Sequence, residues 1–266
     1  MPKNESKEKT VLITGATGAI GKAIAKSIAA TKNYKVVILA RNIEKAKKTI
    51  NDLKASTGNQ NISFIIADIS IKKEIQKVAE GWTGPLHVLI NNAAATPRQR
   101  LETSSGIEMQ FATNVLGYFW MTKFFTSILI KSAPARIVNV ASYWAGNLEL
   151  DDLEFTRRNY NNGTAYRQSK QANRMLNIAF AERLKSDGIT VNVCHPGEVN
   201  SLLSNQLGFG GHESPEYGAA TPVWLATSDE VEGITGSYFE YLHEAQCQFS
   251  NDKVGIEKLF GICGKY

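Results

Sequence analysis

The sequence predicts a single α/β domain with a doubly wound, mostly parallel sheet of about seven strands and helices on both faces. Three observations predict it. Short runs rich in β-branched residues alternate with longer segments of helical period along the 266 residues, as they do where crossover helices join parallel strands. Most of these runs are continuously apolar, which is expected of strands covered on both faces. A glycine-rich turn follows the first run.

The predicted elements follow this alternation in order. Strands are expected at residues 11–14, 35–40, 62–67, 87–91, 136–140, 190–194 and 237–241. Helices are expected at residues 21–32, 43–56, 72–80, 109–132, 164–185 and 215–226. Two irregular segments, 147–163 and 200–214, follow the fifth and sixth strands. Because open α/β sheets bind ligands at the carboxyl ends of their strands, both segments are expected to build a substrate pocket.

The amino-terminal residues indicate a tail and not a targeting segment. Residues 1–9 are rich in lysine and glutamate and lack an apolar core, so a flexible tail is expected there and not a signal peptide. Residues 10–266 are expected to form the one domain. No stretch reaches the roughly 20 apolar residues that a membrane helix needs. We therefore expect a cytoplasmic protein without a membrane span.

Charge and cysteine content exclude several classes of site. The net charge of +5 is spread along the chain, and the densest basic cluster comprises Lys45, Lys47 and Lys48. This cluster adjoins Glu44 and has no aromatic platform, so a solvated helix face is expected and no nucleic-acid site. The three cysteines are widely spaced and form no Cys-x-x-Cys motif. They predict reduced thiols, without a disulfide framework or a metal site.

The glycine-rich turn predicts a dinucleotide site. Gly15, Gly18 and Gly21 lie between an apolar strand and an alanine-rich helix. Gly15 can take an unusual backbone angle, Gly18 can let the backbone approach phosphate, and Gly21 can let helix and strand pack closely. The helix terminus then offers free N–H groups to the anion. The alternative interpretation is a plain turn between strand and helix.

Arg41 predicts the choice of cofactor. It follows the second strand, about 20 residues beyond Gly21, where an acid would bind the ribose 2′-hydroxyl of NAD. Arginine can instead pair with a 2′-phosphate, and Lys22 and Thr17 are candidates for the same group. NADP(H) is therefore predicted, with NAD(H) as the weaker alternative. The alternative interpretation is that Arg41 is an exposed residue at a helix start.

Two further segments follow strands at the same edge. Asp68 follows the third strand at a position suited to the adenine ring, and Asn92 and Ala93 follow the fourth strand beside small residues. Small side chains would let the backbone lie against a cofactor. Alternatively, Asp68 caps the helix that begins near Ser70, and the asparagines close a turn.

Tyr166 and Lys170 predict proton exchange with an alcohol or carbonyl. Four residues separate them along a helix, so the ammonium lies one turn from the phenol and should favour its anion. Ser142, after the fifth strand, can donate a hydrogen bond to a substrate oxygen. Asn114 is expected to hold a water joined to Lys170, or only to satisfy local backbone. An isolated Tyr-x-x-x-Lys pair is usually coincidental, and the other motifs give this one weight.

In these motifs the chain resembles the short-chain dehydrogenase/reductase family, from Val11 to about Tyr241, and most closely its retinol dehydrogenase-like branch. The resemblance rests on the Thr164-Ala-Tyr-Arg-Gln-Ser-Lys170 and His195-Pro196-Gly197 segments and on the long interval between Ser142 and Tyr166. Protochlorophyllide reductases share several of these features. The resemblance implies a Rossmann fold. One departure is Gly18-Ala19, where many members have any residue followed by glycine.

The resemblance also implies the site residues. The catalytic set would be Asn114, Ser142, Tyr166 and Lys170. The cofactor-binding set, combined from motifs and resemblance, would be Gly15, Thr17, Gly18, Ala19, Ile20, Gly21, Arg41, Asp68, Ile69, Asn92, Ala93, Tyr166, Lys170, Pro196, Gly197, Val199 and Ser201. No metal is expected.

These features together predict an NADP(H)-dependent carbonyl reductase or alcohol dehydrogenase for a hydrophobic substrate. An apolar pocket is expected from Tyr143, Trp144, Leu202, Leu203 and Leu207. The alternative is that these residues pack the core or cover a loop. The alternatives are a non-catalytic NADPH-binding regulator and a reductase of a conjugated C=C bond. The aromatic-rich helix after residue 117 suggests a homodimer, because it has more aromatic residues than one helix face needs.

Overall fold

One eight-stranded sheet organises the fold, which a computed structural model describes for residues 8–266. The strand order is β3-β2-β1-β4-β5-β6-β7-β8, and all neighbours are parallel except the antiparallel pair β7 and β8. The strands are β1 (Lys9–Thr14), β2 (Tyr34–Ala40), β3 (Ile62–Ile66), β4 (Val88–Asn91), β5 (Ala135–Val140), β6 (Ile189–His195), β7 (Tyr238–Glu240) and β8 (His243–Ala245). Most of the expected tail, residues 1–9, lies outside the described residues.

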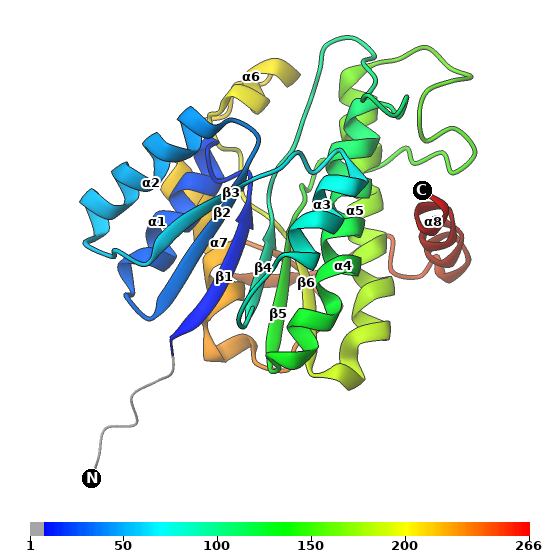
Figure 1. Cartoon of the computed structure of the whole chain (residues 1–266). Helices are drawn as coiled ribbons and strands as arrows, with labels where there is room; N and C mark the ends of the chain where they lie inside the picture. The colour runs from blue at the N-terminus through cyan, green and yellow to red at the C-terminus, as the bar shows by residue number, and fades with distance from the viewer. Residues whose placement is uncertain (1–7) are drawn as a thin grey trace.

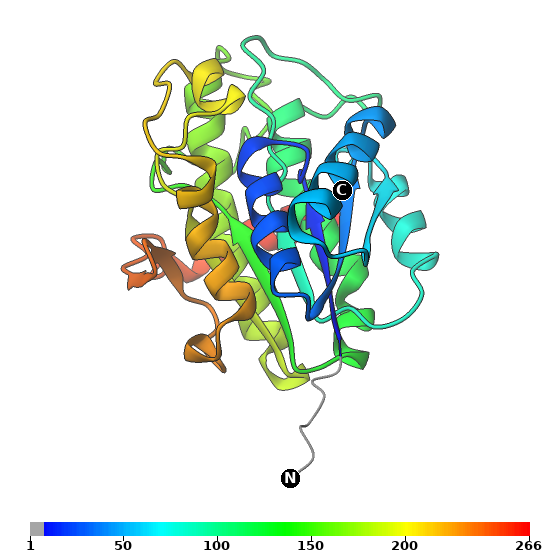
Figure 2. The same cartoon turned by 90° about the vertical axis from the view of Figure 1, so that its left-hand side faces the viewer.

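Helices cover both faces of this sheet. On one face lie α1 (Ala19–Ala30), α2 (Ile43–Thr57) and α7 (Pro215–Thr227), and on the other α3 (Lys72–Glu80), α4 (Gly117–Lys131) and α5 (Asn162–Leu184) (Figures 1 and 2). Shorter turns and outer helices are η1 (Phe111–Leu116), η2 (Lys185–Asp187), η3 (Asp229–Val231), α6 (Leu202–Leu207) and α8 (Lys253–Lys265). Within residues 8–266, every helix is too short or too polar to cross a bilayer.

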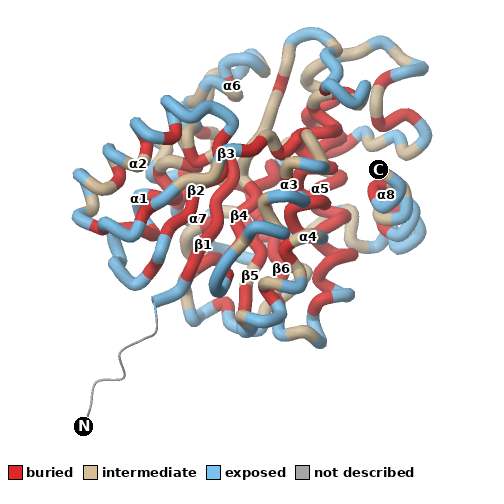
Figure 3. Tube along the Cα trace, in the orientation of Figure 1, coloured by how far each residue is buried: buried red, intermediate tan, exposed pale blue. Residues whose placement is uncertain are grey.

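Two hydrophobic cores enclose the sheet, one on each face. Val11 and Ile13 of β1 pack into the core with α1, α2 and α7, whereas Leu12 between them packs into the core with α3, α4 and α5. Alternate strand residues point to opposite faces, so a strand between two cores must be apolar throughout. Figure 3 shows these buried strands at the centre of the molecule. The prediction of a doubly covered parallel sheet is confirmed.

The order in which the chain adds strands to the sheet reverses between β1 and β4. Thr14, the last residue of β1, accepts hydrogen bonds at Oγ1 from the backbone of Asn92 (2.9 Å) and Ala93 (3.1 Å). These bonds join the loop after β4 to the glycine-rich turn after β1. Ligands of open α/β sheets bind at such a reversal, so the expected cofactor residues meet there.

Each predicted strand and helix is present, and their ends shift by no more than two residues. The expected helix 109–132 differs in kind, because it begins with the π-helical turn η1. Asn114 lies in this turn, and a widened turn of this sort is common at functional sites. Gly117 follows it, and a Cβ there would lie 2.9 Å from the Ile69 carbonyl oxygen. The glycine thus lets α4 approach the loop after β3 closely.

Besides the short turns η2 and η3, three elements were not predicted: β8, α6 and α8. The carboxyl-terminal helix α8 packs against α5, and Phe260 lies 5.2 Å from Phe119 and 5.1 Å from Phe180 between ring centroids. Arg183 of α5 also pairs with Glu257 of α8 at 2.6 Å. Phe119, one of the aromatic residues of the helix that suggested a homodimer, is therefore covered by α8 of the same chain. The homodimer stays a prediction, which sedimentation would test.

Candidate active site

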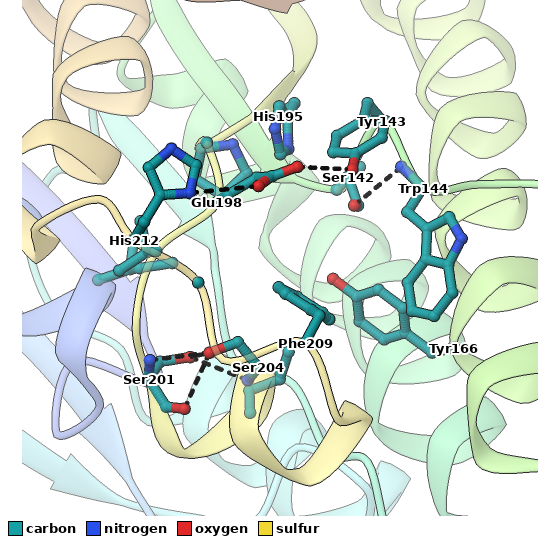
Figure 4. A pocket seen from close by; sticks show the side chains of 17 residues that line it. Ser142, Tyr143, Trp144, Tyr166, His195, Glu198, Ser201, Ser204, Phe209 and His212 are labelled. Carbon is teal, nitrogen blue, oxygen red and sulfur yellow. Dashed lines mark hydrogen bonds and ion pairs between the residues drawn. The ribbon is translucent and has the colours of Figure 1, made fainter.

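Ser142 and Tyr166 line one cavity of about 310 Å³. Ser142 follows β5 by two residues, and its Oγ accepts a hydrogen bond from the Trp144 backbone (3.0 Å), which holds the turn that presents it. Tyr166 lies near the start of α5, whose first turn is capped by Asn161 through a bond from the Thr164 backbone (2.9 Å). Figure 4 shows both hydroxyl groups directed toward the cavity.

Lys170 lies one helical turn beyond Tyr166, as the spacing predicts, and is buried. Its Nζ donates to the Val140 carbonyl oxygen at 3.0 Å and lies 5.5 Å from the centre of the Tyr166 ring. The ring of Tyr118 lies 5.7 Å from the same nitrogen. The ammonium is thus held between β5 and two phenol rings, close to the end of the strand that precedes Ser142.

Burial controls the protonation of both groups. Burial raises the pKa of Tyr166 to about 12, and a hydrogen bond with Ser142 acts in the opposite direction. Burial lowers the pKa of Lys170 to about 7, because the charged ammonium loses its hydration. Burial is the largest cause of the raised pKa of Tyr166, and the expectation that Lys170 and a bound nicotinamide favour the phenol anion stays a prediction. Tyr166 is therefore a protonated phenol near neutrality.

Asn114 joins three segments of the site. Its Oδ1 accepts from the Ala95 backbone N–H (2.8 Å), and its Nδ2 donates to the Ala95 carbonyl (3.0 Å) and the Ser169 hydroxyl (3.2 Å). The loop after β4, the π-helical turn and α5 are thereby bound together beside Lys170. This geometry is compatible with both roles expected of Asn114. Its side chain satisfies the backbone of Ala95, and it also contacts Ser169, the residue before Lys170.

The glycine-rich turn borders a second cavity, of about 320 Å³. Gly15 has φ of +70°, and a Cβ there would lie 2.6 Å from the Ala93 Cα. A Cβ on Gly21 would overlap the Gly15 carbonyl oxygen. Gly18 is the N-cap of α1, so the amides of its first turn have no intrahelical acceptor and are available to an anion. The turn therefore fits the phosphates of a dinucleotide.

Most of the expected cofactor residues border this second cavity. They are Gly15, Thr17, Gly18, Ala19, Ile20, Gly21, Arg41, Asp68, Ile69, Asn92, Ala93 and Ser201. The residues expected beside the nicotinamide, Pro196, Gly197 and Val199, border the first cavity together with Ser142 and Tyr166. Ile20, Ser201 and Leu203 border both cavities. A cofactor in the groove would thus extend toward the two hydroxyl groups.

Arg41 borders the groove that contains the glycine-rich turn. Its guanidinium is 3.6 Å from Asp68 Oδ2, and its side chain is 60% exposed and so free to meet a ligand. Asp68 also accepts at Oδ1 from the Ser70 backbone (2.9 Å). Lys22, expected to help at the 2′-phosphate, instead pairs with Asp52 at 2.6 Å. Lys45, interpreted as part of a solvated helix face, borders the groove.

Comparison with known proteins identifies the family. A family model described as short chain dehydrogenase matches residues 9–208. This chain belongs to the short-chain dehydrogenase family. It is similar to human retinol dehydrogenase 13, with 32% identity over 89% of this chain and 77% of the relative. It is also similar to human retinol dehydrogenase 11, with 34% identity over 89% of this chain and 78% of the relative. The resemblance to the retinol dehydrogenase-like branch is confirmed.

Solved structures of the family have the same fold. The Pseudomonas aeruginosa RhlG/NADP active-site complex superimposes with a TM-score of 0.70 at 25% identity and covers 87% of this chain and 94% of that one. Family and fold together make this chain an oxidoreductase of the short-chain dehydrogenase family and support a nicotinamide cofactor.

Several residues of this short-chain dehydrogenase site were missed in the sequence. Thr96 donates to Gln206 Oε1 (3.0 Å), which joins the loop after β4 to α6 above the groove. His195, Glu198, Phe209 and His212 border the first cavity. Of the leucines expected there, Leu203 borders both cavities, Leu202 borders the groove alone, and Leu207 lies outside both. No sequence signal separates these cases, because α6 has only six residues.

Proposed function

We propose that this protein interconverts a hydrophobic aldehyde or ketone and its alcohol with NADP(H), using Tyr166 as general acid and base. One observation carries the proposal. The hydroxyl groups of Ser142 and Tyr166 face a cavity that shares three bordering residues with the glycine-rich groove. A carbonyl oxygen beside both hydroxyls would therefore lie next to a reagent bound in the groove.

The residues of the groove fit a dinucleotide phosphate. Gly15 and Gly21 leave space that a Cβ would fill, and the amino terminus of α1 offers unbonded amides. Arg41 is the residue we assign to the 2′-phosphate, because guanidinium pairs well with phosphate oxygens. Bound NADPH would supply the hydride to the carbonyl carbon.

The protein supplies the proton and stabilises the developing charge. Tyr166 is protonated at neutral pH because its pKa is about 12, so its hydroxyl can donate a proton to the substrate oxygen. Ser142 donates a hydrogen bond to the same oxygen. Lys170, anchored to Val140, lies where a positive charge stabilises the resulting phenolate. In oxidation of an alcohol the same groups act in the reverse direction.

The cavity supports a substrate with an apolar part. Trp144 packs with its ring centroid 6.1 Å from that of Tyr166 and 5.9 Å from that of Phe209. Leu203 completes this apolar side. The apolar part of a substrate bound here would be removed from contact with water. This burial favours binding of hydrophobic carbonyl compounds over small polar ones.

The test is NADPH oxidation by the purified protein with retinal, aliphatic and aromatic aldehydes, ketosteroids and quinones. We expect Tyr166→Phe to lower kcat by at least about 100-fold, as loss of a general acid does, while NADPH binding persists. Tyr217→Phe is the matched control, since this tyrosine is half exposed and lies outside the cavity lining. Turnover that survives Tyr166→Phe would refute the mechanism. Tight NADPH binding without turnover on any substrate would favour a regulator.

A further inference from the structure

His195 is a buried imidazole whose polar atoms lack partners. Its residue is 3% exposed, and neither ring nitrogen has a hydrogen-bond partner within residues 8–266. Buried polar groups are nearly always hydrogen-bonded, and an unpaired one costs about 1–3 kcal/mol. His195 also borders the cavity that contains Ser142 and Tyr166. A ligand group in that cavity is therefore a candidate partner for the ring.

The ring of His195 is held in place by its neighbours. His195 is the last residue of β6, at the carboxyl end of the sheet. Tyr143 and Tyr241 contact it edge-on, with ring centroids 4.7 Å and 5.9 Å away. Burial lowers the pKa of His195 to about 4, so the ring is neutral near pH 7. A neutral imidazole has one nitrogen that donates and one that accepts.

The cavity is polar on this side and apolar on the other. The polar wall consists of Tyr143, His195, Glu198 and His212. Within it, the Tyr143 hydroxyl donates to Glu198 Oε1 (2.7 Å), and His212 Nδ1 lies 3.4 Å from Glu198 Oε2. Figure 4 shows the polar wall across the cavity from Phe209. A purely hydrocarbon substrate would cover the polar wall without satisfying His195.

We propose that the polar wall binds a hydroxyl group of the substrate, placed away from the reacting carbonyl, and that His195 is its main contact. A hydroxyl both donates and accepts, which matches the neutral imidazole and the Glu198 carboxylate better than a second carbonyl does. The substrate class is thus a hydroxylated hydrophobic carbonyl compound. This inference rests on the proposed function, because it assigns the substrate of the same site.

The test compares decanal with a series of hydroxydecanals whose hydroxyl moves along the chain. We expect the wild type to favour one isomer over decanal by at least about tenfold in kcat/KM, because sites built for a hydroxyl reject analogues that lack it. His195→Phe keeps the ring contacts with both tyrosines and should bring this ratio close to one. His195→Gln keeps a donor and an acceptor and should retain part of the preference. A wild type without preference, or a ratio unchanged in His195→Phe, would mean that a water satisfies His195 and would overturn the proposal.

Calorimetric binding separates this inference from the proposed function. Decanol and the decanediols are titrated into the wild type and His195→Phe in the presence of NADPH, which cannot accept a hydride from an alcohol. Tighter binding of a diol than of decanol, lost in His195→Phe, would support a hydroxyl contact at the polar wall even if no aldehyde were reduced. If decanal were reduced but the diols bound no better than decanol, the proposal that the polar wall binds a hydroxyl would be refuted. The proposed function would be unaffected.

Discussion

The ammonium nitrogen of Lys170 lies 3.0 Å from the carbonyl oxygen of Val140. Val140 ends β5, and Lys170 lies on α5 one turn beyond Tyr166. This hydrogen bond therefore connects the helix that carries the phenol to the strand that leads to Ser142. It also places a positive charge in the interior, where burial lowers the pKa of the lysine.

Lys170 should make the stability of the protein depend on pH. Its pKa is about 7 in the folded protein against an ordinary 10.5, so between these values the unfolded chain binds a proton that the folded protein has released. The free energy of unfolding should rise with pH in this window. Urea unfolding from pH 7 to pH 10 should give a smaller rise for Lys170→Met than for the exposed control Lys26→Met. Equal slopes would contradict the assignment.

Gly15→Ala should impair both stability and cofactor binding. Gly15 and Gly58 both have φ of +70°, but only at Gly15 would a Cβ meet other atoms, namely those of Ala93. Gly58→Ala is thus a matched control that reports backbone strain alone, about 1–2 kcal/mol. The clash should cost Gly15→Ala about 1–3 kcal/mol more in urea unfolding. NADPH affinity, measured by fluorescence titration, should fall at least about tenfold for Gly15→Ala. The two variants behaving alike would count against this packing.

Arg41→Ala should change the choice between NADPH and NADH. Loss of a charge-assisted pair with the 2′-phosphate should weaken NADPH binding by about 10- to 100-fold and affect NADH little. Lys22→Ala serves as the control, because Lys22 pairs with Asp52. Fluorescence titration with both cofactors measures the ratio. If Arg41→Ala left the preference for NADPH over NADH unchanged, another residue would bind the 2′-phosphate. Lys45 is the next candidate, because it also borders the groove.

Leu259→Ala should destabilise the protein through α8. Leu259 is fully buried against the core that contains α4 and α5, whereas Val254 of the same helix is 81% exposed. We expect Leu259→Ala to lower the free energy of unfolding by about 2–5 kcal/mol. Val254→Ala should change it by no more than about 0.5 kcal/mol. Urea unfolding measures both changes. If α8 were only loosely attached, both variants would have the same free energy of unfolding as the wild type.

The sequence by itself determined the features that depend on neighbours along the chain. Continuous apolar runs located seven strands, because burial on both faces requires them. The spacing of Gly15 and Gly21 predicted a tight turn, and the four-residue interval from Tyr166 to Lys170 placed both groups on one helix face. These geometries arise within a turn or two of backbone, so local residue types suffice.

Only the tertiary structure decided the properties that depend on packing between distant segments. Burial, and with it the raised pKa of Tyr166 and the lowered pKa of Lys170, comes from helices and loops far apart in the sequence. The same holds for the pairing of Lys22 with Asp52 and for the cavity that contains His195. Desolvation and cavity shape are sums over many distant neighbours, which no local pattern records.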